Sequence, residues 1–386
     1  MIAYNNKWLN NLLIRKEADK AYQSACISKE EKEQVYTAYP SGLYTPNLFV
    51  RLGLFILTII IALFTLGLFF LFFISAREEQ VGGMIFFFGL ILYAALEFMV
   101  NKNHYNSGVD DALLLTCPIG IICGLNILST ISWLANAIFI FILALYLFLR
   151  FTNRIMAAVT GLAFIAIVFL SFIKLGETAK ALAPFAVMIT AAFIFLFVQR
   201  LIKKEKSKQY RDGLLMVSIT ALVCFYAAGN YYVVRETSIA LFNLNLQEGE
   251  SMPVAWLFWI FTVTIPILYI VRGIQKKDVV FLRIGLLLIA AMVFTVRYYY
   301  HVMPIESAAV IAGILFIVLA YALIKYLEEP RHGFTYKKED DAFFMDKVQI
   351  ESLLIAQAFT GTATPTDSGT QFGGGTGGGG GATGDY

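Results

Sequence analysis

Long apolar runs separated by short polar segments dominate the chain from residue 49 to residue 327. A helix needs about 20 apolar residues to cross a hydrocarbon layer about 30 Å thick. The runs are too uniformly apolar to be strands of a membrane β-barrel, in which apolar and polar residues alternate. They must be helices, because backbone groups in lipid have to form hydrogen bonds within their own segment. The pattern predicts an all-α, polytopic integral membrane helical bundle of about ten transmembrane helices. The predicted spans are 49–75, 81–100, 110–127, 130–150, 155–174, 179–201, 212–232, 252–273, 279–298 and 304–327.

The composition agrees with this prediction. Apolar side chains make up 59% of the 386 residues and charged ones 15%, which is too apolar for an ordinary soluble domain. The first 48 residues are polar and charged, and the first apolar run is longer than the core of a secretory signal. We therefore expect no cleavable signal peptide.

Basic residues are unevenly distributed between the two sides of the predicted bundle. Of the 30 lysine and arginine residues, 23 fall on the side of the N-terminus, 5 fall on the other side, and Arg51 and Arg283 lie just inside helices. Cytoplasmic loops of membrane proteins carry an excess of lysine and arginine. Both termini are therefore predicted to be cytoplasmic, and the basic loop 199–211 supports this topology most strongly.

The chain divides by composition into four parts. Residues 1–48 are predicted to form a cytoplasmic amphipathic helical hairpin, and residues 49–327 the transmembrane bundle. Residues 328–360 form a cytoplasmic segment with an amphipathic helix, and residues 361–386 a disordered Gly-rich tail.

The hairpin has two interpretations. Its apolar residues recur at helical spacing, and Ser28 lies three residues before Glu31, as in a capping box. It either packs as a lid on the bundle or offers a docking surface for a partner. The candidate partner contacts on the two terminal segments are Trp8, Leu12, Phe343, Phe344, Leu353 and Leu354.

Three segments carry a resemblance. "ISKEEKEQVYTAYP" (27–40), "FVRLGLFILTIIIALF" (49–64) and residues 281–323 resemble a bacterial family of polytopic membrane proteins with an N-terminal helical domain of unknown function. The Gly-rich tail is similar to those of bacterial membrane proteins bearing a TPM domain, although this chain shows no such domain. The resemblance implies a multi-pass protein of the bacterial cytoplasmic (inner) membrane and supplies no site residues.

Two features of the bundle have alternative interpretations. "FVRLGL" (49–54) and "FLRIGL" (281–286) are nearly the same hexapeptide, through either internal duplication or chance. The third run, 110–127, is short and contains Pro118, so it either crosses the membrane or re-enters it. The small residues Gly120 and Gly124 favour a buried packing helix.

One polar stretch, "NKNHYNSGVDD" (101–111), gathers a histidine, acids and amides between two apolar runs. Its candidate ion or proton site consists of Glu97, His104, Asp110 and Asp111, because carboxylates and an imidazole bind cations or relay protons. The alternative is a turn with a helix cap. Ser107 and Asp110 have capping-box spacing, and acids in a first turn complement the helix dipole. The turn and cap explain more of the residues.

No P-loop, HExxH, GxSxG or paired CxxC motif is present in the sequence. We therefore expect no enzyme activity, no metal and no cofactor. Basic residues follow the membrane boundary, so we expect no nucleic-acid binding. Ionisable residues lie at helix ends, which favours a non-enzymatic scaffold or accessory subunit that contacts the bilayer and a membrane or cytoplasmic protein partner. The alternative is a transporter or channel for a small solute, including a neutral one.

Overall fold

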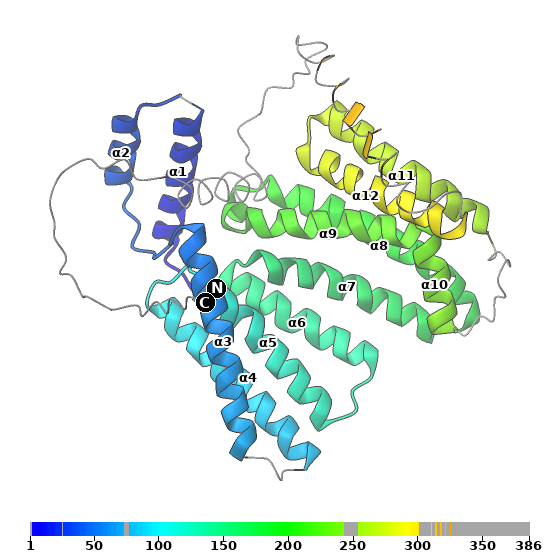
Figure 1. Cartoon of the computed structure of the whole chain (residues 1–386), viewed down its shortest axis with the longest axis horizontal. Coiled ribbons are helices and arrows are strands. Elements are labelled where there is room, and N and C mark those ends of the chain that lie inside the picture. The colour runs from blue at the N-terminus through cyan, green and yellow to red at the C-terminus, as the bar shows by residue number, and fades with distance from the viewer. Residues whose placement is uncertain are drawn as a thin grey trace, which may run out of the picture. The chain divides into compact units, whose positions relative to one another are not determined.

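The computed structural model describes residues 2–24, 26–72, 77–242 and 254–300, and seven isolated helical positions between 310 and 325. Among these residues there is no strand, and one isolated β-bridge joins Tyr44 to His104. Their helices are shown in Figure 1: α1 (Asn6–Gln23), α2 (Lys29–Ala38), α3 (Leu48–Phe72), α4 (Glu78–Asn101), α5 (Val109–Leu128), α6 (Trp133–Phe151), α7 (Arg154–Lys174), α8 (Glu177–Ile202), the 3₁₀ helix η1 (Glu205–Tyr210), α9 (Arg211–Gly229), α10 (Tyr231–Phe242), α11 (Ala255–Lys276) and α12 (Val279–Tyr299).

Within the described part of the chain, nine helical segments are long and apolar enough to cross a membrane. They are α3 to α8, the continuous segment η1–α9, α11 and α12, and they agree with nine of the ten predicted spans. Most of the predicted span 304–327 lies outside the described residues. The protein is therefore a multi-pass membrane protein with an all-α, polytopic bundle.

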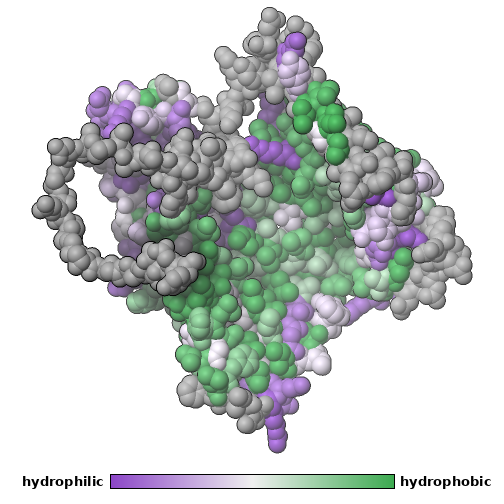
Figure 2. Space-filling model, viewed as in Figure 1, coloured by the Kyte–Doolittle hydropathy of each residue, from purple (hydrophilic) through white to green (hydrophobic). Residues whose placement is uncertain are grey.

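Apolar side chains cover much of the bundle surface (Figure 2). Helix α3 is the most exposed of the spans. Only 6% of its most apolar stretch is buried inside the protein, against 28–44% for the other spans. Phe64 and Leu71 on α3 are 73% and 65% exposed. Such exposure of large apolar side chains is costly in water, so lipid must solvate this surface.

Consecutive helices pair as antiparallel hairpins, most extensively in α4–α5, α6–α7, α8–α9 and α11–α12. Because direction alternates, the starts of α3, α5, α7, α9 and α12 lie at the same end of the bundle as the ends of α4, α6, α8 and α11. We call this end, to which α1 is attached, the α1 end. One apolar core includes buried residues of α1, α4, α5, α6, α7 and α9, and a second one joins α8, α9, α11 and α12.

Helix α5 is continuous through the buried Pro118, which supports the spanning interpretation over the re-entrant one. It packs closely on α4 through glycines. A Cβ atom at Gly89 would lie 2.6 Å from the backbone nitrogen of Ile121, and one at Gly124 would overlap the backbone of Phe86. The predicted packing role of the small residues in α5 is confirmed.

Helices α1 and α2 precede the bundle and contact each other. The capping box of α2 is present in both directions: Glu31 N donates to Ser28 Oγ at 3.2 Å, and Ser28 N donates to Glu31 Oε2 at 2.8 Å. Arg15 donates to the backbone carbonyls of Tyr36 and Tyr39, which ties α1 to the end of α2.

The close approach of α4 and α5 generates a prediction. Gly124→Ala should lower the free energy of unfolding by about 1–3 kcal/mol, because backbone atoms would have to move to admit the methyl group. Gly67→Ala is the matched control, since a Cβ atom there meets nothing within 4 Å. Thermal unfolding of the two variants in the same detergent checks this, and equal stability of both would contradict the packing described here.

Candidate functional site

Three ion-pair networks connect helices at the α1 end. In the first, Arg51 of α3 reaches Asp111 of α5, with Nε and Nη2 at 2.8 and 2.7 Å from Asp111 Oδ2. Asn153, the N-cap of α7, donates to Asp111 Oδ1 at 3.4 Å. The Asp111 side chain is only 10% exposed. Its charge is therefore used to hold α3, α5 and the start of α7 together.

The second network joins α4 to α6. Arg150 donates from Nε to Glu97 Oε1 at 2.5 Å and from Nη2 to Glu97 Oε2 at 2.8 Å, a two-pronged geometry that carboxylate and guanidinium groups favour. Tyr93 OH donates to Glu97 Oε1 at 2.6 Å and lies 2.7 Å from Tyr146 OH. Both carboxylate oxygens of Glu97 are thereby occupied by side chains of the bundle.

The third network attaches α1 to the bundle. Asp212, in the first turn of α9, forms ion pairs with Arg154 of α7 and with Lys16 of α1. Lys16 Nζ is 3.5 Å from Asp212 Oδ2. Gln209 also donates to Asn10 of α1 at 3.4 Å. Helix α1 thus makes polar contacts with the α8–α9 connection and with α9.

The residues before α1 pack against the end of α6 and against the α4–α5 turn. Ala3 N donates to the carbonyl of Arg150 at 2.9 Å, and the ring of Tyr4 meets that of Tyr105 edge-on at 4.8 Å. Burial and, secondarily, the nearby carboxylate of Asp110 raise the pKa of the Tyr4 phenol well above 10.0. The segment before α3 reaches the same turn, since Tyr44 N donates to the carbonyl of Asn103 at 2.8 Å.

Asp110 is the centre of the α4–α5 turn. Asp110 is 2% exposed, and its carboxylate accepts hydrogen bonds from the backbone N–H of Asn106, the backbone N–H of Ser107 and the Ser107 hydroxyl, each at 2.8 Å. His104 Nδ1 lies 3.1 Å from the same hydroxyl oxygen. Because that hydroxyl donates its proton to Asp110, Nδ1 of His104 is the donor in this contact.

Of the four residues of the predicted ion or proton site, the turn connects two. His104 and Asp110 are joined through Ser107, whereas Glu97 and Asp111 belong to separate networks. Throughout the described ranges, no group of three or more His, Cys, Asp or Glu side chains could hold a metal ion. The arrangement can transmit a proton from the imidazole to a buried carboxylate, and it can equally serve as a rigid turn.

The predicted cap of α5 is wrong in one detail. The N-cap residue is Gly108, and the Ser107 hydroxyl donates to Asp110 instead of accepting a backbone N–H. Gly108 has φ +94°, and a Cβ atom there would overlap the carbonyl oxygen of Arg51. The turn therefore needs glycine both for its backbone angle and for the close approach of α3.

The predicted partner contacts divide into two groups. Trp8 and Leu12 pack against the first core, and Trp8 lies so close to Gly42 that a Cβ atom there would be 2.8 Å from its ring. These two side chains are used within the chain, as the lid interpretation requires. Phe343, Phe344, Leu353 and Leu354 lie outside the described residues.

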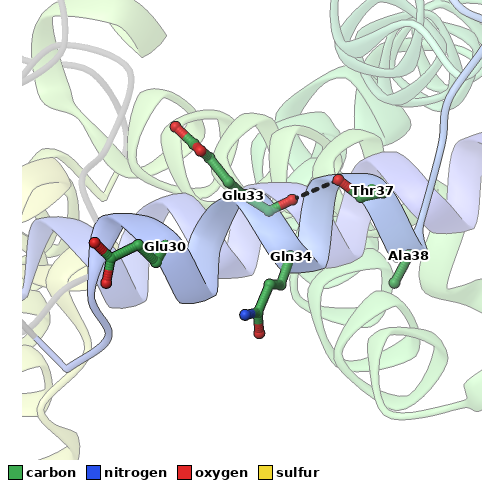
Figure 3. A pocket seen from close by; sticks show the side chains of 5 residues that line it. All are labelled: Glu30, Glu33, Gln34, Thr37 and Ala38. Carbon is green, nitrogen blue, oxygen red and sulfur yellow. Dashed lines mark hydrogen bonds between the residues drawn. The ribbon is translucent and has the colours of Figure 1, made fainter.

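The outer side of α2 is free of the bundle. None of its ten residues is buried. An open, shallow pocket of about 540 Å³ lies against this helix, and Figure 3 shows the side chains that line it. The described residues that line it all belong to α2: Glu30, Glu33, Gln34, Thr37 and Ala38. Two carboxylates and an amide are among these side chains.

A buried polar cluster that the sequence did not predict lies at the opposite end of the bundle. Asn230, 2% exposed, separates α9 from α10 and donates to Tyr226 OH at 2.9 Å and to Thr295 Oγ1 at 3.0 Å. Tyr231 N donates to Thr262 Oγ1 at 2.9 Å. These bonds satisfy polar groups freed by the helix break.

Comparison with known proteins gives no relative: no protein-family model, no curated protein and no solved structure matches the chain. The resemblances noted in the sequence therefore stay predictions.

The turn generates a test of the two interpretations of the polar stretch. Asp110→Ala should lower the free energy of unfolding by about 1–3 kcal/mol, because buried donors lose their acceptor. His104→Ala should cost less, because the half-buried ring has only its contact with Ser107 Oγ and an edge-on contact with the ring of Tyr44 to lose. Thermal unfolding checks the stabilities, and cation binding is measured by titration with Zn²⁺ and Mg²⁺. Saturable cation binding that His104→Ala abolishes would contradict the structural interpretation.

Proposed function

We propose that the protein is a non-enzymatic scaffold or accessory subunit of a complex in the bacterial cytoplasmic membrane. The α1 end faces the cytoplasm in this proposal. Its support is the charge distribution: the basic loop 199–211, the hairpin and the α4–α5 turn share one end of the bundle, and lysine and arginine concentrate on the cytoplasmic side of membrane proteins.

The observation that carries the proposal is the exposure of α2. A short helix normally gains its stability by burying an apolar face. Helix α2 buries none of its residues and is attached to α1 by polar contacts, among them Lys32 to Asp19 at 2.7 Å and Tyr36 OH to Asp19 at 2.8 Å. A helix whose residues stay unburied in this way is suited to contact another protein.

The chemistry of the α1 end supports a non-enzymatic role. Catalytic side chains need atoms that are free to contact a substrate, and these atoms must converge in a concave site. At the α1 end the carboxylates Glu97, Asp110, Asp111 and Asp212 are each engaged by partners within the chain. They hold the helices in place instead of converging on a substrate.

The broken helix at Asn230 favours a second candidate, a transporter of a small neutral solute. Discontinuous helices form binding sites in many transporters. The polar side chains at this break, Asn230, Thr262 and Thr295, are all neutral. Their hydrogen-bonding groups are bonded to one another and to the backbone, which is why we place this function second.

Extraction of the complex tests the proposal. The full chain and Glu30→Gln/Glu33→Gln are purified from native membranes in mild detergent, and bound proteins are quantified by mass spectrometry. We expect a stoichiometric partner with the full chain and a loss of at least about fivefold with the variant, as for a contact of moderate energy. The matched control is Glu78→Gln/Glu79→Gln, exposed acids at the opposite end of the bundle.

A chain truncated after Leu327 tests the second set of predicted contacts, Phe343, Phe344, Leu353 and Leu354. Equal partner loss in the α2 variant and its control would contradict the role of α2. If the full chain purifies alone, the scaffold proposal fails, and solute uptake into liposomes then tests the transporter.

A further inference from the structure

The connection between α8 and α9 displays an unbalanced positive charge. Residues 199–211, "QRLIKKEKSKQYR", contain six basic residues and one acid. The acid, Glu205, pairs with Lys208 within the connection. The other five basic side chains are exposed and form no ion pair with an acidic residue of the described ranges: Arg200, Lys203, Lys204, Lys206 and Arg211.

The inner side of this connection is fixed to the protein. Tyr210 OH donates to the carbonyl of Leu149 at 2.9 Å, and its ring meets that of Phe148 edge-on at 5.6 Å. Leu201 and Ile202 pack against the first core. The 3₁₀ helix η1 between the two long helices therefore presents its lysines outward from an anchored backbone.

The position of the connection in the chain determines the depth of its basic side chains in the membrane. It joins two spanning helices, because α8 ends at Ile202 and α9 begins at Arg211. A segment that is this short and is flanked by two spans lies at the level of the lipid headgroups. Clusters of four to eight basic residues directly beside a membrane span attract anionic lipids.

The nearest acid of α9 does not neutralise the cluster. Asp212 follows Arg211 directly, but its carboxylate is engaged by Arg154 and Lys16 from α7 and α1. The ion pairs described above thus leave the basic side chains of the connection available. Their natural counterions in a bilayer are phosphate groups of anionic lipids.

We propose that the α8–α9 connection is a binding site for the headgroup of an anionic phospholipid in the surrounding bilayer. Exposed Lys203, Lys204 and Lys206 supply charge at headgroup level, with Arg200 and Arg211 at the two ends of the connection. This site is independent of the scaffold proposal, since it requires only that the two flanking helices span the membrane.

Lipid titration of the full chain tests the site. The purified protein is titrated with phosphatidylglycerol and separately with phosphatidylcholine, and bound lipids are counted by native mass spectrometry. We expect preferential binding of phosphatidylglycerol, a reduction of that preference by salt, and a loss of at least about tenfold in affinity for Lys203→Gln/Lys204→Gln/Lys206→Gln. The matched control Lys7→Gln/Lys29→Gln/Lys102→Gln removes the same charge from exposed positions elsewhere at the α1 end.

Further arms distinguish the alternatives. Replacement of the same three lysines by arginine should preserve binding, since the charge is kept. Equal affinity of the wild-type protein for both lipids, or an equal loss in the control variant, would overturn the site. Displacement of the lipid by an excess of inorganic phosphate would assign the site to a free anion and overturn the lipid proposal. The wild-type measurements decide the question even if the triple variant does not fold.

Discussion

Charged side chains close to a hydrocarbon layer need opposite charges, and this constraint organises the α1 end. An isolated charge that is removed from water costs several kcal/mol, whereas a well-oriented partner with hydrogen bonds offsets most of that cost. Arg51 and Asp111 connect α3 to α5, and Glu97 and Arg150 connect α4 to α6. Each pair therefore joins helices that are not consecutive in the chain, and the pairing specifies which helices are neighbours at this end.

Because of this pairing, charged side chains at the α1 end fall into two groups, those engaged within the chain and those exposed. At the α1 end the acids Glu97, Asp110, Asp111 and Asp212 of the bundle helices are engaged by contacts within the chain, whereas the lysines of residues 199–211 remain exposed. The acids thus act as structural elements, and the surface at this end is shaped by a basic connection and by the outer side of α2. Both surfaces are suited to binding other molecules, which is the basis of the scaffold and lipid proposals.

Hydropathy was sufficient to predict the nine spans of the described residues, because lipid imposes length and apolarity on each helix separately. The capping box at Ser28 was also predictable, since it depends on residues three apart. The pairing of Glu97 with Arg150 was not, because 53 residues separate them and only helix packing brings them together. The break before α10 was missed for the same reason: Asn230 depends on Thr295, 65 residues away. In the candidate site, the short sequence separation of His104 and Asp110 was enough to predict that they lie close together. The partners of Asp111 and Glu97, which are Arg51 and Arg150, are too distant in the sequence to be predicted in this way.

A double-mutant cycle between Glu97 and Arg150 tests the structural role of these charges most directly. Glu97→Gln, Arg150→Gln and the double variant are compared with the wild-type protein by thermal unfolding in lipid nanodiscs. We expect a coupling free energy of about 1–3 kcal/mol, with the double variant more stable than the sum of the two single losses implies. A coupling close to zero would show that the pair does not hold α4 and α6 together, and would contradict the account.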